Sequence, residues 1–210
     1  LGENHLYSTT LFKFNSEMQP YLERGLELGR SFVQPKYWGK RSLDYLWFGI
    51  GAFLRKHPEF RYLFGPVSIS NNYPAKAMEM LVYFYRTHFP PSGDLVAAQL
   101  PFVIDPARKT ELADMFPGRD YKEEFNLLKA SLSHMDLSVP TLYKQYPEIC
   151  TEGGAQFAGF NVDPAFADCV DGLIIVDLAK LKEKKRQRYI GDKAAAPDND
   201  CSTHYRPPVN

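Results

Sequence analysis

The spacing of apolar and polar positions predicts a chain that alternates between strands and helices. Apolar side chains three and four positions apart predict a helix over 42–56, which Ser42 and Asp44 suit as a start. The same spacing predicts helices over 17–25, 74–88, 120–133 and 139–149. Dense or alternating apolar runs predict strands over 6–14, 27–34, 62–70, 95–104, 155–163 and 168–181.

Proline and glycine modify two of these strands. Pro35 ends the predicted strand 27–34, because proline cannot donate to a strand ladder. Gly65 and Pro66 lie inside 62–70 and predict an irregular or bulged strand there. The order of elements predicts an α/β (α+β) fold with mixed strand directions.

Composition narrows the possible functions. The chain has 210 residues with 25 basic and 25 acidic side chains, so its net formal charge is zero. Dedicated nucleic-acid binders usually carry a global basic excess, so we expect no nucleic-acid partner. The 44% hydrophobic content is that of an ordinary globular protein.

The cysteines and histidines predict no metal site and a cytoplasmic location. Three widely spaced cysteines form no CxxC pair, and the five histidines form no HxxxH motif. Reduced thiols in the cytoplasm are the simplest interpretation. The first residue is not methionine, from which we expect the chain to be the C-terminal part of a longer gene product.

The loop 35–41 joins a predicted strand to a predicted helix and is rich in cations. It contains Lys36, Lys40 and Arg41 around Gly39 and has no acidic residue. Backbone N–H groups at a helix start favour an anion, so a phosphate or pyrophosphate suits this loop. The alternative is a solvated basic turn in front of an ordinary helix.

The stretch ELGRSFVQPKYWGKRSLDYLWFGIGAFL, followed by YLFGPVSISNNY, resembles a known family. It is similar to the GNAT-type acyltransferase domain of the hemolysin-like family, which includes ornithine-lipid N-acyltransferases and parts of lysophospholipid-acyltransferase fusions. The likeness extends over about 7–190, including GGAQFAGFNVDPAFADCVDGLIIVDL. It implies a mostly antiparallel central sheet flanked by helices. It also implies that the usual first elements of the fold are missing or replaced by the segment 90–150.

The resemblance assigns a thioester-binding role to the loop. In such enzymes the loop binds the phosphate of an acyl donor, and no permanently bound cofactor is implied. Arg41 departs from the small residue that the family has there, which favours the phosphopantetheine of an acyl carrier protein over coenzyme A. The donor-binding residues implied are Val33, Gln34, Lys36, Gly39, Lys40, Arg41 and Ser42.

The ELGR element is also similar to the E-x-x-R pair of acyl-homoserine-lactone synthases, which use acyl carrier protein. The likeness implies that Glu27 binds the acceptor amine or hydroxyl or takes its proton, because an ammonium must lose a proton to become a nucleophile. It implies that Arg30 binds an acceptor carboxylate or braces Glu27. Alternatively, the two only form an ion pair that ties the strand to its neighbour. Ser68, Ser70 and Asn71 are candidates for the acceptor side of the site, or simply end a strand.

Together these features predict an acyltransferase domain over 1–190, with a flexible tail over 191–210. It would move a fatty acyl group from acyl carrier protein or coenzyme A to an amine or hydroxyl acceptor, in ornithine-lipid or lysophospholipid synthesis. The basic run 180–188 predicts peripheral contact with the inner membrane or with an acidic carrier protein, or a solvated surface. The alternative function is a non-catalytic GNAT-like module that binds acyl carrier protein, lipid or a protein partner.

Overall fold

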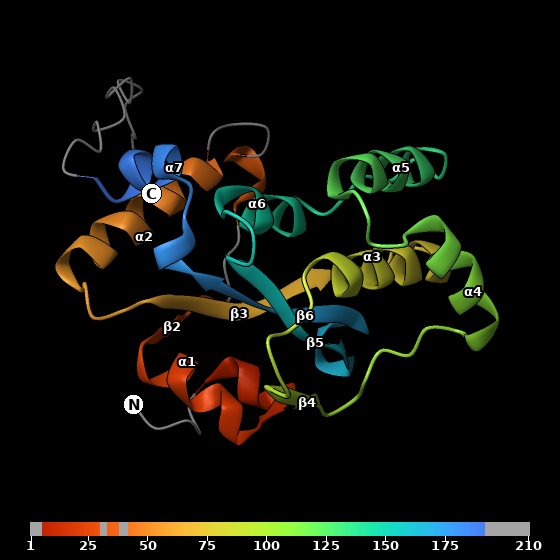
Figure 1. Cartoon of the computed structure of the whole chain (residues 1–210), viewed down its shortest axis with the longest axis horizontal. Helices are drawn as coiled ribbons and strands as arrows, with labels where there is room; N and C mark the ends of the chain where they lie inside the picture. Colours follow the sequence, from red (N-terminus) through yellow and green to blue (C-terminus); the bar gives the residue numbers. More distant parts are fainter. Residues whose placement is uncertain (1–5, 30–32, 38–41, 192–210) are drawn as a thin grey trace, which may run out of the picture. The chain divides into compact units, whose positions relative to one another are not determined.

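The structure is a computed structural model that describes residues 6–29, 33–37 and 42–191. The chain divides into two compact units. Unit 1 consists of Leu1–Phe32 and Glu59–Leu181, and unit 2 of Val33–Pro58 and Lys182–Asn210. Figure 1 shows the elements of both.

Unit 1 is built on a four-stranded sheet with the order β2-β3-β6-β5. The short strand β2 is parallel to β3, and the other neighbours are antiparallel. The predicted mixed, mostly antiparallel sheet flanked by helices is therefore confirmed. The strands are β2 (Gly25–Glu27), β3 (Tyr62–Ile69), β5 (Ala155–Asp163) and β6 (Cys169–Asp177).

The pairing of β3 with β6 runs without a break over eight residue pairs, so the predicted bulge in β3 is wrong. Leu28 N donates to Phe64 O, which means that the N–H and C=O groups of alternate β3 residues, Pro66 included, face β2. Pro66 therefore lacks an N–H only on the side of β2, where the described pairing already ends at Glu27 and Phe64. No hydrogen bond to β6 is lost. The irregularity lies instead in β5, between Phe157 and Gly159.

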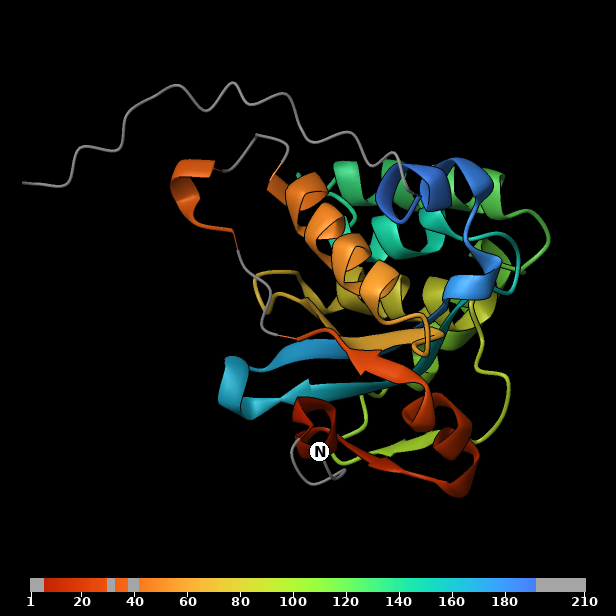
Figure 2. The same cartoon turned by 90° about the vertical axis from the view of Figure 1, so that its left-hand side faces the viewer.

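One face of this sheet is covered by the N-terminal segment together with β4 (Val96–Ala98), as Figure 2 shows. The segment contains η2 (Tyr7–Thr10), β1 (Phe12–Phe14), η3 (Ser16–Met18) and α1 (Gln19–Glu23), and β1 pairs with β4. A buried cluster joins the two layers: Leu11, Phe12, Met18, Phe64, Leu95, Val96, Leu173 and Ile175. Non-local contacts thus fix this layer.

The opposite face is covered by α3 (Ala75–His88) and α6 (Thr141–Ile149). Buried rings of Tyr85, Tyr143 and Phe157 meet there with centroids 5.0–5.1 Å apart. Such offset and edge-to-face contacts stabilise an interior beyond the area they bury. The remaining elements of unit 1 are α4 (Pro106–Met115), α5 (Tyr121–Ser133), η5 (Pro164–Phe166) and η6 (Leu178–Lys180).

Unit 2 contains η4 (Pro35–Tyr37), α2 (Ser42–Lys56) and α7 (Glu183–Tyr189). Gly51 of α2 lies so close to α7 that a Cβ there would be 1.8 Å from Tyr189 O. Arg188 Nη2 and Tyr189 Oη bind the carboxylate of Asp44 at 2.6 and 2.7 Å. Part of the basic run therefore joins two helices of this unit.

Several predicted boundaries differ from the structure. The predicted strand 6–14 is a 3-10 turn followed by β1, and the predicted strand 27–34 ends at Glu27 in its described part. Helix α4 lies between the predicted strand 95–104 and the predicted helix 120–133, where the sequence pattern predicted no element. Pro106 occupies its first turn, and the side chain of Asp105 caps it by accepting from Ala107 N. Within the described residues, no helix is long and apolar enough to span a membrane.

Strand β6 offers a test of packing against the aromatic layer. We expect Gly172→Ala to lower the free energy of unfolding by about 1–3 kcal/mol, because a Cβ there would be 2.7 Å from Tyr143 Oη and 2.9 Å from the Phe157 ring. Gly49→Ala in α2 is the control, since its Cβ meets nothing within 4 Å and alanine favours helix. Urea unfolding measures both; equal stability of Gly172→Ala and the native chain would contradict this packing.

A buried carboxyl on β6 offers a second test. Burial raises the pKa of Asp171 to about 6, opposed by the hydrogen bond from Ser68 and assisted by Asp163. The unfolded chain then ionises before the folded one, so this group costs stability as the pH rises from about 4 to above 6. The free energy of unfolding of Asp171→Asn, relative to that of the native chain, should therefore rise by about 2 kcal/mol as the pH is raised from 4.5 to 7.5. Urea unfolding at both values measures this, and a pH-independent difference would contradict it.

Candidate active site

Glu27, the predicted acceptor-binding residue, is held by the N-terminal segment. Its Oε1 accepts from Ser8 N at 2.7 Å and from Ser8 Oγ at 2.6 Å, and its Oε2 accepts from Tyr7 N at 3.0 Å. A carboxylate offers about four acceptor positions, so these three donors leave about one, on Oε2. Glu27 is half-buried, so its carboxylate is fixed in direction while one position stays open to a further donor.

The same segment connects Glu27 with the far end of the sheet. Tyr7 uses its backbone N–H for Glu27 and its phenol for Asp163, whose Oδ2 accepts at 2.9 Å. The other oxygen of Asp163 accepts from Ala165 N at 2.9 Å. Tyr7 therefore positions two carboxylates of unit 1 at once.

Strands β2 and β3 are in close contact where the described part of β2 ends. Leu28 N donates to Phe64 O at 2.7 Å, and a Cβ at Gly65 would be 2.1 Å from Leu28 O. Only glycine allows this approach. A cavity of about 10 Å³ is lined here by Leu28, Leu63, Phe64, Gly65, Val67, Tyr146 and Ile174.

Arg30 lies outside the described residues, so its pairing with Glu27 or with an acceptor carboxylate stays a prediction. The hydrogen bonds that Glu27 makes do not depend on it. Both interpretations of the E-x-x-R pair therefore remain compatible with the observed geometry of Glu27.

The predicted residues at the end of β3 meet a polar row across the sheet. Ser68 stands opposite Asp171 of β6, which in turn stands opposite Asn161 of β5. Ser68 Oγ donates to Asp171 Oδ1 at 2.5 Å. Ser68 is four residues along β3 from Phe64, the partner of Glu27, which separates the two positions by about 13 Å. The structure thus places Glu27 and Ser68 in one sheet without contact between them.

Ser70 and Asn71 take local roles at the end of this strand. Ser70 Oγ accepts from Asn72 N at 3.3 Å. The backbone of Asn71 is a hydrogen-bond partner of the Cys169 thiol, whose pKa is raised chiefly by burial. These contacts match the alternative that both residues end a strand, and a role in acceptor binding stays a prediction.

The predicted donor loop belongs to unit 2 and is described only in part. Val33, Gln34, Lys36 and Ser42 are described, whereas Gly39, Lys40 and Arg41 lie outside the described residues. Lys36 is exposed, with its Nζ 4.8 Å from the centroid of the Tyr37 ring. Ser42 Oγ donates to Tyr37 O at 2.8 Å, so its hydroxyl proton is already used in a hydrogen bond within this segment. Binding of a phosphate by these residues stays a prediction.

Sequence reasoning did not identify Tyr7, Ser8, Asp163 and Asp171 as site residues. Ser8 lies in a segment whose pattern predicted a plain strand, and its contact with Glu27 is non-local. Asp171 lies inside the apolar run of β6, whose other aspartate, Asp177, ends the strand, and only 2% of the surface of Asp171 is exposed. That isolated charge in an apolar strand was the one signal available from sequence.

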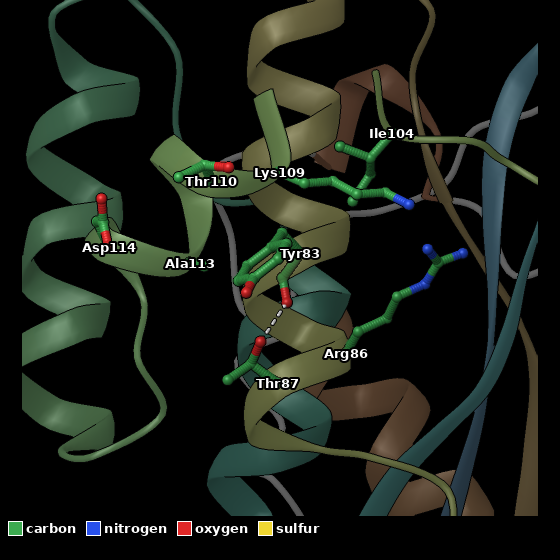
Figure 3. Close-up of a pocket in the computed structure, with 8 residues that line it drawn as sticks. All are labelled: Tyr83, Arg86, Thr87, Ile104, Lys109, Thr110, Ala113 and Asp114. Atoms are coloured by element: carbon green, nitrogen blue, oxygen red, sulfur yellow. Dashed lines mark hydrogen bonds between the residues drawn. The ribbon is translucent and has the colours of Figure 1, made fainter. Parts of the chain in front are cut away.

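A further cavity of about 540 Å³ lies between α3 and α4, away from these residues. Figure 3 shows Arg86 and Lys109 extending to one side of it and Asp114 on the other. Arg86 Nη2 donates to Phe102 O at 3.2 Å, and desolvation lowers the pKa of this guanidinium. None of the residues that the sequence assigned to donor or acceptor binding lines this cavity.

Comparisons with known proteins agree with the resemblance in the sequence. Residues 1–48 match the acetyltransferase (GNAT) domain family. The glycine N(alpha)-acyltransferase of Bacteroides thetaiotaomicron is 28% identical over 197 residues, 90% of this chain and 58% of the relative. The L-ornithine N(alpha)-acyltransferase of Rhodobacter capsulatus is 28% identical over 166 residues, 79% of this chain and 55% of the relative.

A second L-ornithine N(alpha)-acyltransferase, from Brucella abortus, is 30% identical over 162 residues, 77% of this chain and 50% of the relative. The chain thus spans between half and three fifths of the length of these relatives. No solved structure gives a significant match. By its sheet and by these likenesses, the chain resembles a GNAT-type domain and is similar to N-acyltransferases.

Proposed function

We propose that this domain transfers an acyl group from a thioester to the amino group of an amino acid. The relatives named for glycine and L-ornithine support an amino-acid acceptor. The observation that carries the proposal is the fixed carboxylate of Glu27, with one acceptor position left on Oε2 beside the end of β2. An ammonium donor fits that position.

The proposed reaction is a direct displacement. The acceptor arrives as an ammonium and gives one proton to a base, for which Glu27 is our candidate. The amine nitrogen attacks the thioester carbonyl carbon, the C–N bond forms and the C–S bond breaks. The attacking nitrogen loses a second proton as the amide forms, and the leaving thiolate takes up a proton, so that a thiol and an amide result. Three hydrogen bonds spare the carboxylate any reorganisation when the acceptor binds, which is the advantage of a preorganised site.

For the donor we propose a fatty acyl chain on acyl carrier protein, with coenzyme A as the alternative. Lys36 and the loop up to Ser42 would bind its phosphate, together with the N-terminus of α2. Asp44 in the first turn of α2 would repel an anion, but Arg188 forms an ion pair with Asp44 and offsets the charge of this carboxylate. Lys184 is exposed on α7, and we propose this surface for peripheral membrane contact in a cytoplasmic, lipid-forming enzyme.

The function is tested by thiol release from long-chain acyl carrier protein and acyl coenzyme A, with glycine and ornithine as acceptors. We expect release that depends on the acceptor, and a fall of about 10²–10⁴-fold in kcat for Glu27→Gln, with donor binding nearly unchanged. Unchanged turnover in Glu27→Gln would remove Glu27 from the mechanism. Donor binding without any release would instead support the non-catalytic module.

Ser8 provides a finer test of how Glu27 is held. We expect Ser8→Ala to lower kcat by about tenfold, because one of three donors to the carboxylate is lost. Thr10→Ala is the matched control: it loses a hydroxyl of the same turn that donates only to Tyr7 O in the described structure. Equal kcat in both variants would show that Ser8 does not position Glu27.

A further inference from the structure

Asp171 combines deep burial with an incomplete set of hydrogen bonds. Only 2% of its surface is exposed, and its Oδ2 has no hydrogen-bond partner among the described residues. Its Oδ1 accepts a single bond, from Ser68 Oγ. Buried carboxylates are normally paired or accept several bonds, because an unmet acceptor loses its hydration without compensation. The hydrogen bonds of the fold therefore compensate the charge of Asp171 only in part.

The surroundings of Asp171 specify a cationic donor. The charged group that acts on it within the described part of unit 1 is another carboxylate, Asp163, whose oxygens already bind Tyr7 Oη and Ala165 N. The amide of Asn161, opposite Asp171, is engaged by Leu100 N and Val162 O. Two acidic groups thus lie close together, and no described cation acts on Asp171.

Ser68 connects this buried charge with the surface. Its side chain is exposed, and its hydroxyl proton points to Asp171, so its lone pairs remain as acceptors for an incoming N–H. A bound ammonium would donate to Ser68 Oγ and feel the negative charge behind it, in an interior where charges interact strongly. A neutral donor would gain only the hydrogen bond to Ser68 Oγ and not the attraction to the charge of Asp171.

We propose that Ser68 and Asp171 form a binding subsite for a primary ammonium group of the acceptor. This rests on the proposed function and names the substrate chemistry of the same face of the sheet. Two sources offer that group: the reacting α-amine, or a second amine on the side chain of a diamino acid. Because Glu27 and Ser68 are about 13 Å apart along β3, one amine cannot contact both. Glycine and ornithine therefore distinguish the two sources.

The experiment compares KM and kcat for glycine and ornithine in the native chain, Asp171→Asn and Ser68→Ala. If the subsite binds a side-chain amine, KM for ornithine rises about tenfold in both variants and KM for glycine does not change. If it binds the reacting amine, KM rises for both amino acids, and Glu27, about 13 Å away, is then excluded as the base for that amine. Unchanged KM for both amino acids in both variants would overturn the subsite.

Asp136→Asn is the matched control. It removes one exposed carboxylate from the loop after α5, at a positive φ of 56° that asparagine tolerates, and should leave KM unchanged. Ser68→Ala changes an exposed residue and guards against a folding defect in Asp171→Asn, which thermal unfolding of each variant monitors.

Direct binding separates this proposal from the function proposed above. Calorimetry of ornithine and 1,4-diaminobutane needs no thioester and no turnover. Weaker binding of either ligand by about tenfold in Asp171→Asn supports the subsite even where no thiol release occurs. Equal binding by the native chain and Asp171→Asn would overturn the subsite, whatever the outcome of the thiol-release assay.

Discussion

The burial of β6 on both of its faces is the constraint on which the rest of unit 1 depends. Eight of its nine residues are buried, between β3 and β5 in the sheet and between two covering layers. A strand with no solvent face must be almost wholly apolar. The N-terminal segment supplies the layer on one side, and α3 with α6 supplies the layer on the other. The segment that binds Glu27 is therefore also needed to cover the sheet.

This dual use explains why the carboxylate of Glu27 is held in one orientation. Tyr7 and Ser8 belong to the layer that buries Phe64 and Leu173, and the same turn directs three donors to Glu27. The orientation of the carboxylate is thus stabilised by packing energy that the fold needs in any case. Gly65 contributes by steric means, because it lets Leu28 approach β3 where the described part of β2 ends.

The sequence predicted long, locally determined elements better than contacts between distant segments. Helix α2 begins and ends where its apolar stripe indicates, at Ser42 and Lys56, and β5 has its predicted bounds. The 3-10 turn η2 was not predicted, because its donors are satisfied by Glu27, 19 and 20 residues away. Likewise, the resemblance located Glu27 and Ser68 within a candidate site, whereas Asp171 is linked to Ser68 only through strand pairing across 103 residues.

Glu27 and Asp171 lie in the same sheet but are held in opposite ways, and this difference has a functional meaning. Glu27 is nearly saturated by donors from its own fold, so a ligand that approaches it meets a group of fixed geometry. Asp171 has one donor, and burial raises its pKa to about 6, so the fold alone does not fully stabilise its charge. A ligand cation at Ser68 would compensate that cost on binding. In the proposed subsite, the stability that the isolated fold gives up at Asp171 would be returned as affinity and selectivity for a charged acceptor.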